Sequence, residues 1–296
     1  MRVPERIAIT GSSGLIGTAL VGHLKSEGHT VQRLVRRAPV AVDEVTWDPN
    51  TGYVDLSALK GVDAIIHLAG APVADQRWTK KYKTEILNSR LMGTTTIAKA
   101  AAEVKPDVFI SASAIGWYGE SGNRAVVESD RVGDDFLAAT CREWEAAANL
   151  ATGVRTVKLR TGLVLDPTGG ALGKMLPLFR LGFGGRLGDG KQWWSWITLH
   201  DLVRAIDFTL VEEISGPVNL TSPNPVTNQE FTSALARALH RPALFPAPSF
   251  ALKAALGGFS TEVLGSKRVI PQVLQNAGFT WDYPHITEAL KVLVES

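Results

Sequence analysis

The sequence has little cysteine, no basic block and no long apolar run. Its 296 residues contain one cysteine, Cys141, and six scattered histidines, so we expect no internal disulfide and no metal site. The formal net charge is only +2, and no basic block suggests a nucleic-acid or anionic-membrane partner. No apolar run approaches the roughly 18 residues of a membrane span, and the early first strand leaves no room for a cleavable signal. We therefore expect a cytoplasmic protein with no nucleic-acid or membrane partner.

The most informative segment that the sequence does contain is residues 7–17, where an apolar strand pattern ends in three glycines as a helical pattern begins. In such a turn Gly11 permits a backbone conformation closed to other residues, Gly14 lets the main chain approach a phosphate, and Gly17 allows close packing of helix and strand. A turn that merely reverses the chain is the alternative. A second strand pattern at residues 29–35 completes the strand–helix–strand unit that dinucleotide binding requires.

The end of the second strand indicates which dinucleotide binds, because that position meets the ribose that carries the adenine. NAD-binding chains usually place an acidic residue there, whereas this chain has Arg36 and Arg37 and no carboxylate until Asp43. A guanidinium can hold a 2′-phosphate through charge-assisted hydrogen bonds. The sequence therefore favours NADP(H) as the cofactor; solvated loop charges are the alternative interpretation.

Short apolar strands alternate with helical patterns through the first half of the chain. Strands are expected at 62–68, 108–113 and 155–165, and helices near 79–103 and 134–151, which predicts an α/β fold with a Rossmann-type doubly wound parallel sheet. The second half is glycine-rich between 169 and 190 and proline-punctuated between 217 and 248, with helices expected near 200–213, 228–239 and 285–295. We predict an NADP(H)-binding domain at residues 1–168 and a smaller substrate-side lobe at residues 169–296, with a final segment from about residue 246.

Several further motifs carry a family resemblance. The glycine turn, residues 67–70 and the strand that ends at residues 111–113 resemble the extended short-chain dehydrogenase/reductases. A narrower set is similar to the atypical YfcH-like proteins of the epimerase family; it comprises residues 77–79, 85, 88–90, 169–173, 196–197, 200–201 and 267–272. The resemblance covers nearly the full length, and it implies a Rossmann sheet that carries a C-terminal substrate lobe.

The resemblance also implies contacts with the cofactor. It adds the turn residues Ser13, Leu15 and Ile16 to the glycines, and it places Arg36 on the 2′-phosphate. The complete set of expected cofactor-binding residues is Gly11, Ser13, Gly14, Leu15, Ile16, Gly17, Arg36, Leu68, Ala69, Glu85, Arg90 and Val164. Glu85 and Arg90 could instead form an ion pair with each other, although residues five apart do not lie on one face of a helix. Val164 could instead be an ordinary residue of the hydrophobic core.

The chain departs from the family pattern at the acid–base pair. Short-chain enzymes carry a tyrosine and, four residues later, a lysine that lowers the tyrosine pKa, and here those positions align with Leu137 and Cys141. The remaining catalytic candidates are Ser113, which could donate a hydrogen bond to an oxyanion, and Tyr118, which would need a nearby cation such as Arg90 to lower its pKa. A strand-end turn for the serine and packing for the tyrosine are the alternatives.

Two functions from different classes remain open on the sequence. In the first, the protein is an NADP(H)-dependent oxidoreductase or epimerase that acts on a small or nucleotide-linked carbonyl or hydroxyl substrate. In the second, it is a non-catalytic NADP(H)-binding sensor or scaffold, a role that a cell-division label among some relatives would suit. The missing tyrosine–lysine pair favours the second, whereas the cofactor motifs and the aromatic cluster at residues 193–196 favour the first. The sequence indicates no oligomeric state.

Overall fold

A central sheet of eight strands organises the computed structural model, which describes residues 5–295. Every pairing in it is parallel except the one between β3 and β4. In spatial order the strands are β12 (Gly216–Leu220), β8 (Arg155–Thr161), β6 (Val108–Ala114), β5 (Ala64–His67), β1 (Arg6–Thr10), β2 (Thr30–Val35), β3 (Glu44–Asp48) and β4 (Tyr53–Val54). The predicted Rossmann-type α/β fold is confirmed.

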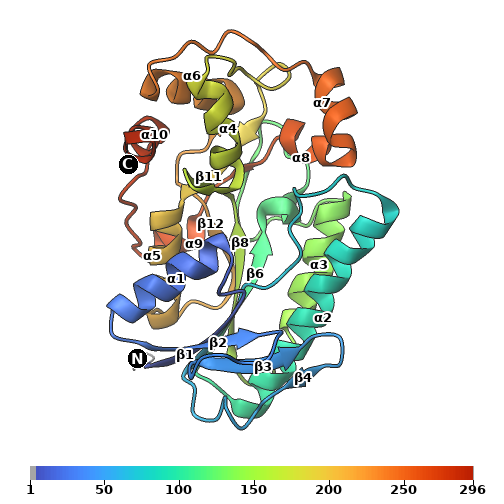
Figure 1. Ribbon diagram of the computed structural model, residues 1–296, viewed down its shortest axis with the longest axis vertical. Helices are drawn as coiled ribbons and strands as arrows, with labels where there is room; N and C mark the ends of the chain where they lie inside the picture. Colours follow the sequence, from blue (N-terminus) through green and yellow to red (C-terminus); the bar gives the residue numbers. More distant parts are fainter. Residues whose placement is uncertain (1–4, 296) are drawn as a thin grey trace.

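Helices cover both faces of this sheet (Figure 1). On one face α1 (Leu15–Ser26) and α5 (Leu199–Val211) pack against buried residues such as Ile7 and Ile66. On the other face α2 (Lys80–Val104) and α3 (Phe136–Ala148) pack together and cover residues such as Phe109. Strands that are apolar throughout are expected in a parallel sheet that is covered on both sides.

The expected strand at residues 155–165 is divided in two. The chain leaves the central sheet after β8, and β9 (Leu163–Asp166) pairs instead with β11 (Trp196–Thr198). Gly162 lies at the break, where a Cβ would come within 2.6 Å of the Ser195 carbonyl oxygen. This close backbone approach requires glycine and directs β9 out of the sheet.

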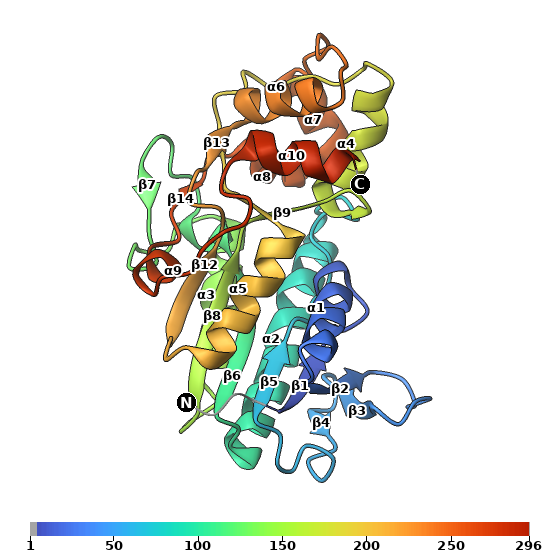
Figure 2. The same ribbon diagram turned by 90° about the vertical axis from the view of Figure 1, so that its left-hand side faces the viewer.

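A smaller C-terminal lobe lies beyond the carboxyl ends of the central strands (Figure 2). Its core packs α4 (Gly170–Arg180), α6 (Asn228–Ala238) and α10 (Ile286–Glu295) around Trp196 and Phe231. The remaining elements are η1 (Ile115–Tyr118), β7 (Ala125–Val126), β10 (Trp193–Trp194), β13 (Val226–Thr227), α7 (Ser249–Leu256), η2 (Gly257–Phe259), α8 (Ser260–Leu264), β14 (Arg268–Val269) and α9 (Gln272–Asn276).

The two lobes are not consecutive segments of the chain, as the predicted boundary at residue 168 would require. After β9, α4 and β11, the chain returns to the central sheet as α5 and β12 before it re-enters the lobe. Val218 and Leu220 of β12 are fully buried in the same core as Ile7 of β1. Burial of these apolar side chains explains why the chain returns to the sheet as β12. The alternation of strand and helix patterns in the sequence did not predict this strand. None of the helices within residues 5–295 combines the length and apolar character that a membrane crossing needs.

Candidate functional site

The glycine turn after β1 has the close backbone packing that glycine allows. Gly11 has a φ of +70°, and a Cβ there would lie 2.8 Å from the Leu68 carbonyl carbon and 2.9 Å from the Ala69 nitrogen. At Gly17 a Cβ would lie 2.1 Å from the Gly11 carbonyl oxygen. Gly11 therefore brings the turn against the end of β5, and Gly17 folds the first turn of α1 onto it. Leu68 and Ala69 lie beside the turn, and their contact with the adenosine half of a cofactor stays a prediction.

The N-terminus of α1 is suited to an anion. Gly14 is its N-cap and supplies no side chain to the first amides of the helix, so these N–H groups and the positive end of the helix dipole are left for another acceptor. A Cβ on Gly14 would meet only the Gly11 oxygen, at 3.5 Å, so this side of the turn is open. Ser13 is exposed, while Leu15 and Ile16 are half-buried. Phosphate binding at these residues stays a prediction that the geometry fits.

Three arginines at and just after β2 have different surroundings. Arg33 donates to Asp43 at 2.7 and 3.0 Å, and Arg37 donates to both oxygens of Glu44 at 2.6 and 2.7 Å. Hydrogen bonds from these arginines are the main reason that the carboxyl pKa values of Asp43 and Glu44 are both lowered to about 2. Arg36 is exposed, and within residues 5–295 no hydrogen bond or ion pair engages its guanidinium. Of the three, Arg36 is the cation free to hold a phosphate.

Glu85 and Arg90 on α2 are not paired with each other in the described chain. Glu85 is exposed, while the Arg90 guanidinium donates to the carbonyl oxygens of Ala71 and Ile86 at 2.9 and 3.1 Å. It also lies over the Trp144 ring, 4.8 Å from the centroid, and burial lowers the pKa of Arg90. Arg90 therefore fixes the loop after β5, beside the glycine turn; its contact with a cofactor stays a prediction. Val164, half-buried on β9, packs against the main core.

The loop after β5 also closes against the C-terminal lobe. Arg77 donates to the Ala254 carbonyl at 3.0 Å, and Trp78 packs its ring against Phe136 and Phe259. The Leu15 side chain at the start of α1 lies 3.2 Å from the position that a Cβ on Gly169 would take. Elements of both lobes therefore lie beside the glycine turn, at the carboxyl ends of the strands, where ligands bind in open α/β sheets.

Ser113 and Tyr118 lie in a buried polar network that the sequence analysis did not identify. Glu145 on α3 accepts from Ser113 Oγ at 2.8 Å and from the Arg160 guanidinium at 2.8 and 3.0 Å. Arg160 on β8 also donates to the Tyr118 hydroxyl at 3.1 Å, and Tyr118 donates to Asn219 Oδ1 at 2.7 Å. All five side chains are buried. A charged pair in this position requires these partners to offset its desolvation.

This network bears on both catalytic candidates, whose roles stay predictions. The Ser113 hydroxyl proton is donated to Glu145, so in this geometry it is not directed at a substrate oxyanion. Burial raises the pKa of the Tyr118 phenol to about 12, although Arg160 opposes the shift. The cation beside Tyr118 is therefore Arg160 rather than Arg90, and it does not bring the tyrosine near neutrality.

The positions of the missing tyrosine–lysine pair face η1. Leu137 Cβ and Cys141 Sγ lie 3.1 and 3.5 Å from where a Cβ on Gly116 would be. Cys141 Sγ donates weakly to the Ala114 carbonyl at 3.6 Å, and burial raises the pKa of its thiol to about 12. Helix α3 thus presents packing residues where an acid–base pair would be expected.

The other polar and aromatic candidates are structural. His67 is fully buried, hydrogen-bonds Thr10 at 2.7 Å, and burial lowers its pKa to about 3. Trp196 is core, and Trp193 stacks with Arg268 at 4.4 Å. The ligand atoms of His200, Asp201 and Asp282 lie within 4.8 Å of one another, but Arg204 forms ion pairs with both carboxylates. Helix α5 is capped by Thr198, whose side chain accepts from the Asp201 amide.

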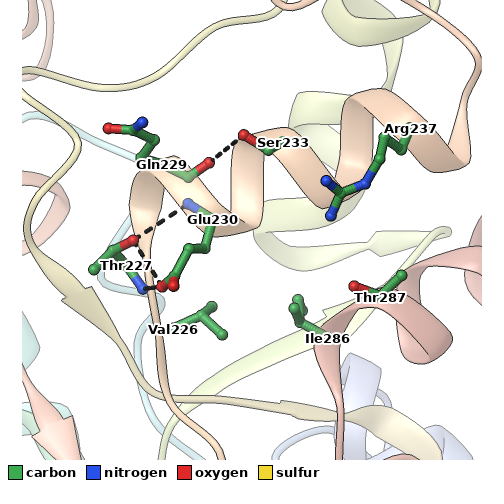
Figure 3. Close-up of a pocket in the computed structure, with 8 residues that line it drawn as sticks. All are labelled: Val226, Thr227, Gln229, Glu230, Ser233, Arg237, Ile286 and Thr287. Carbon is green, nitrogen blue, oxygen red and sulfur yellow. Dashed lines mark hydrogen bonds between the residues drawn. The ribbon is translucent and has the colours of Figure 1, made fainter.

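A separate hollow of about 610 Å³ lies between α6 and α10 (Figure 3). Its polar groups are largely occupied within α6, because Thr227 and Glu230 form a capping box and Ser233 donates to the Gln229 carbonyl. None of the predicted site residues lines it. The candidate site is therefore the glycine turn.

Comparisons with known proteins identify the family. Residues 7–220 match the NAD dependent epimerase/dehydratase family, and residues 247–293 match a domain of unknown function, DUF1731. An epimerase family protein of Mycobacterium bovis is 46% identical over 96% of each chain. Human epimerase family protein SDR39U1, solved with NADPH, is 33% identical with a TM-score of 0.91 and coverage of 98% of this chain and 99% of its own.

A nucleoside-diphosphate sugar epimerase of Corynebacterium glutamicum is 37% identical with a TM-score of 0.79. The match covers 97% of the present chain but only 57% of that protein.

Proposed function

The chain belongs to the NAD dependent epimerase/dehydratase family, and we propose that it binds NADP(H) and exchanges a hydride with a carbonyl or hydroxyl substrate. The observation that carries the cofactor assignment is the unpaired Arg36 at the end of β2, beside a glycine turn whose helix amides have no side-chain cap. Arg33 and Arg37 are held by carboxylates, so a 2′-phosphate would find one free guanidinium. The human relative solved with NADPH supports the same assignment.

Each predicted residue has a distinct task in this proposal. The turn from Gly11 to Gly17 binds the diphosphate through its amides, and Leu68 and Ala69 flank the adenosine half. Arg90 holds the loop after β5 in position, and Val164 lies beside the nicotinamide half. The cofactor supplies the hydride chemistry, while the protein binds it, orients it and excludes water.

The substrate class in the proposal is a small or nucleotide-linked carbonyl or hydroxyl compound. Support comes from the Corynebacterium relative, which is named a nucleoside-diphosphate sugar epimerase. The glycine-rich segment 182–190 with Arg186 and Lys191 offers cations for such an anionic substrate.

The second candidate is a non-catalytic NADP(H)-binding sensor or scaffold. The residues at the position of the usual tyrosine–lysine pair favour it. Leu137 and Cys141 are packing residues there, and the protons of Ser113 and Tyr118 are donated within the protein. A scaffold would need the cofactor site without a proton donor.

Two measurements on the purified full chain test the proposal and separate the candidates. Fluorescence titration with NADPH and NADH should show tighter binding of NADPH, and failure of both dinucleotides to bind would exclude both candidates. Single-turnover oxidation of bound NADPH by quinones, aldehydes and nucleotide sugars should then consume the cofactor with at least one acceptor class. Tight binding with no oxidation by any acceptor would reject the enzyme in favour of the scaffold.

A further inference from the structure

Six large apolar side chains are exposed at the end of the C-terminal lobe, and we call them the apolar tip. Each is between 55% and 77% exposed. They are Leu178 of α4, Leu181 and Phe183 of the loop after it, Leu244 and Phe245 of the loop before α7, and Phe250 of α7. Contiguous exposed apolar patches of this kind mark interaction surfaces more often than isolated residues do.

The two loops of the apolar tip are fixed to each other. The rings of Phe183 and Phe245 have centroids 5.9 Å apart, and the Phe245 amide donates to the Gly184 carbonyl at 3.3 Å. The Arg241 guanidinium donates to the Arg180 carbonyl at 3.1 Å. Figure 1 shows the loop from α6 to α7 passing over the end of the lobe. The loops that carry Phe183, Leu244 and Phe245 therefore lie side by side.

Helix α7 extends this surface. Its sequence is apolar except for Ser249 and Lys253, yet none of its residues is buried. Leu252 and Leu256 are half-buried, while Phe250 is 77% exposed, so the helix adds one large apolar side chain to the surface.

The segments that carry the apolar tip contain cations and no carboxylates of their own. Residues 170–188 and 231–261 contain six Lys or Arg residues and no Asp or Glu, whereas the whole chain carries a net charge of only +2. The carboxylates next in sequence are engaged, because Asp189 accepts from an amide, Glu230 caps α6 and Glu262 pairs with Lys267. Lys174 pairs with Asp75, whereas Arg237 lines the hollow between α6 and α10. Arg180, Arg186, Arg241 and Lys253 remain on the segments that carry the apolar residues.

This charge selects the occupant. A second copy in a two-fold dimer would meet the tip with the same cations, and like charges across an interface oppose association. Phe and Leu flanked by Lys and Arg are the composition that lies in the interface of an anionic bilayer. We propose that the apolar tip docks this protein on the surface of a membrane that contains anionic lipids. A nearby hollow of about 330 Å³, lined by Arg186 and Leu244, offers room for a headgroup phosphate.

The cations are far apart in the sequence, so the sequence contains no basic block that would predict this surface. Arg180 ends α4 and Arg186 lies in the loop after it, while Arg241 and Lys253 lie before and in α7, and hydrogen bonds hold these two segments side by side. The proposal does not depend on catalysis or on cofactor binding.

The test is flotation of the full chain with vesicles of phosphatidylcholine alone or mixed with phosphatidylglycerol. We expect binding to the mixed vesicles, weakened by added salt, and little binding to phosphatidylcholine. Phe245→Ser combined with Phe250→Ser should abolish binding, and Lys253→Glu should weaken it by about fivefold or more for the lost charge. Val42→Ser is the matched control, since Val42 is an equally apolar, exposed residue outside the tip.

Folding of each variant is checked by circular dichroism, and the tip residues are exposed enough that their loss should not unfold the chain. The proposal is overturned if wild-type protein fails to float with mixed vesicles, if it floats equally with both kinds, or if Val42→Ser matches the double variant. Light scattering that shows a dimer lost in the double variant would identify a second copy as the occupant and would likewise overturn it.

Discussion

The glycine turn and the face of α3 opposite η1 lie in the same fold but differ in what they leave available. At the turn, the helix amides have no side-chain cap and Arg36 has no partner within residues 5–295. At α3, Leu137 and Cys141 pack on η1, while the hydroxyls of Ser113 and Tyr118 are committed to Glu145 and Asn219. Groups that bind a dinucleotide are left open, whereas groups that would move a proton are closed off by packing.

This difference teaches that one Rossmann fold can leave the predicted cofactor turn open while it packs the position of the usual acid–base pair. Leu137 and Cys141 occupy that position, and the nearby Glu145 and Arg160 form a buried ion pair that joins α3 to the sheet.

The largest effect is expected from Gly17→Ala, which tests whether the glycine turn binds the cofactor. A Cβ there would collide with the Gly11 oxygen at 2.1 Å, so the turn must shift. Overpacking of this kind costs about 1–3 kcal/mol in unfolding free energy, and NADPH affinity should fall by roughly two orders of magnitude as the amides lose alignment. The control is Gly22→Ala in the same helix, where nothing lies within 4 Å. Titration showing wild-type affinity for Gly17→Ala would remove the turn from the site.

The pH dependence of stability tests whether His67 is core or base. Its pKa is about 3 in the folded protein against 6.5 ordinarily, so the unfolded chain binds a proton first as pH falls. Stability should therefore be complete above about pH 6.5 and decline by roughly 2 kcal/mol by about pH 5. Asp43 and Glu44, with pKa values of about 2, lose their contribution only at lower pH.

Urea unfolding of the wild type and of His67→Gln measures this dependence. The variant should lack the decline between neutral pH and about pH 5. An identical slope in both proteins would show that His67 is not buried in its neutral form.

Tyr118→Phe separates a structural tyrosine from a catalytic one. Removing the hydroxyl leaves Asn219 Oδ1 without its donor and Arg160 with one partner fewer, so stability should fall by about 1–2 kcal/mol. Single-turnover NADPH oxidation should stay within about threefold of the wild type. A loss of 100-fold or more, the size typical of a removed general acid, would restore Tyr118 to the mechanism and break the comparison.

The smallest effect is expected at Cys141. Because the thiol is buried and its pKa is raised to about 12, a thiol reagent should leave the native protein unlabelled near neutral pH. Labelling should become complete in denaturant. Rapid labelling of the folded protein would show that the face between α3 and η1 is open to ligands.

Local patterns in the sequence predicted much of the fold. The strand and helix patterns after Ile7 predicted β1, α1 and β2, and the glycine spacing predicted the positive φ at Gly11. Three features depend on tertiary contacts and were missed. Glu145 and Arg160 meet only because α3 packs beside β8, Gly162 redirects a strand through an approach to Ser195, and β12 joins the sheet from the second half of the chain.

The most direct test of the central claim is the ratio of the NADH and NADPH dissociation constants for the wild type, Arg36→Ala and Arg37→Ala. Arg36→Ala should weaken NADPH by about 10- to 100-fold, the loss of charge-assisted hydrogen bonds to the 2′-phosphate, and leave NADH within about twofold. Arg37→Ala should preserve the wild-type ratio, since Glu44 already holds that guanidinium. Equal losses of NADPH and NADH in Arg36→Ala would contradict the assignment of Arg36 to the 2′-phosphate.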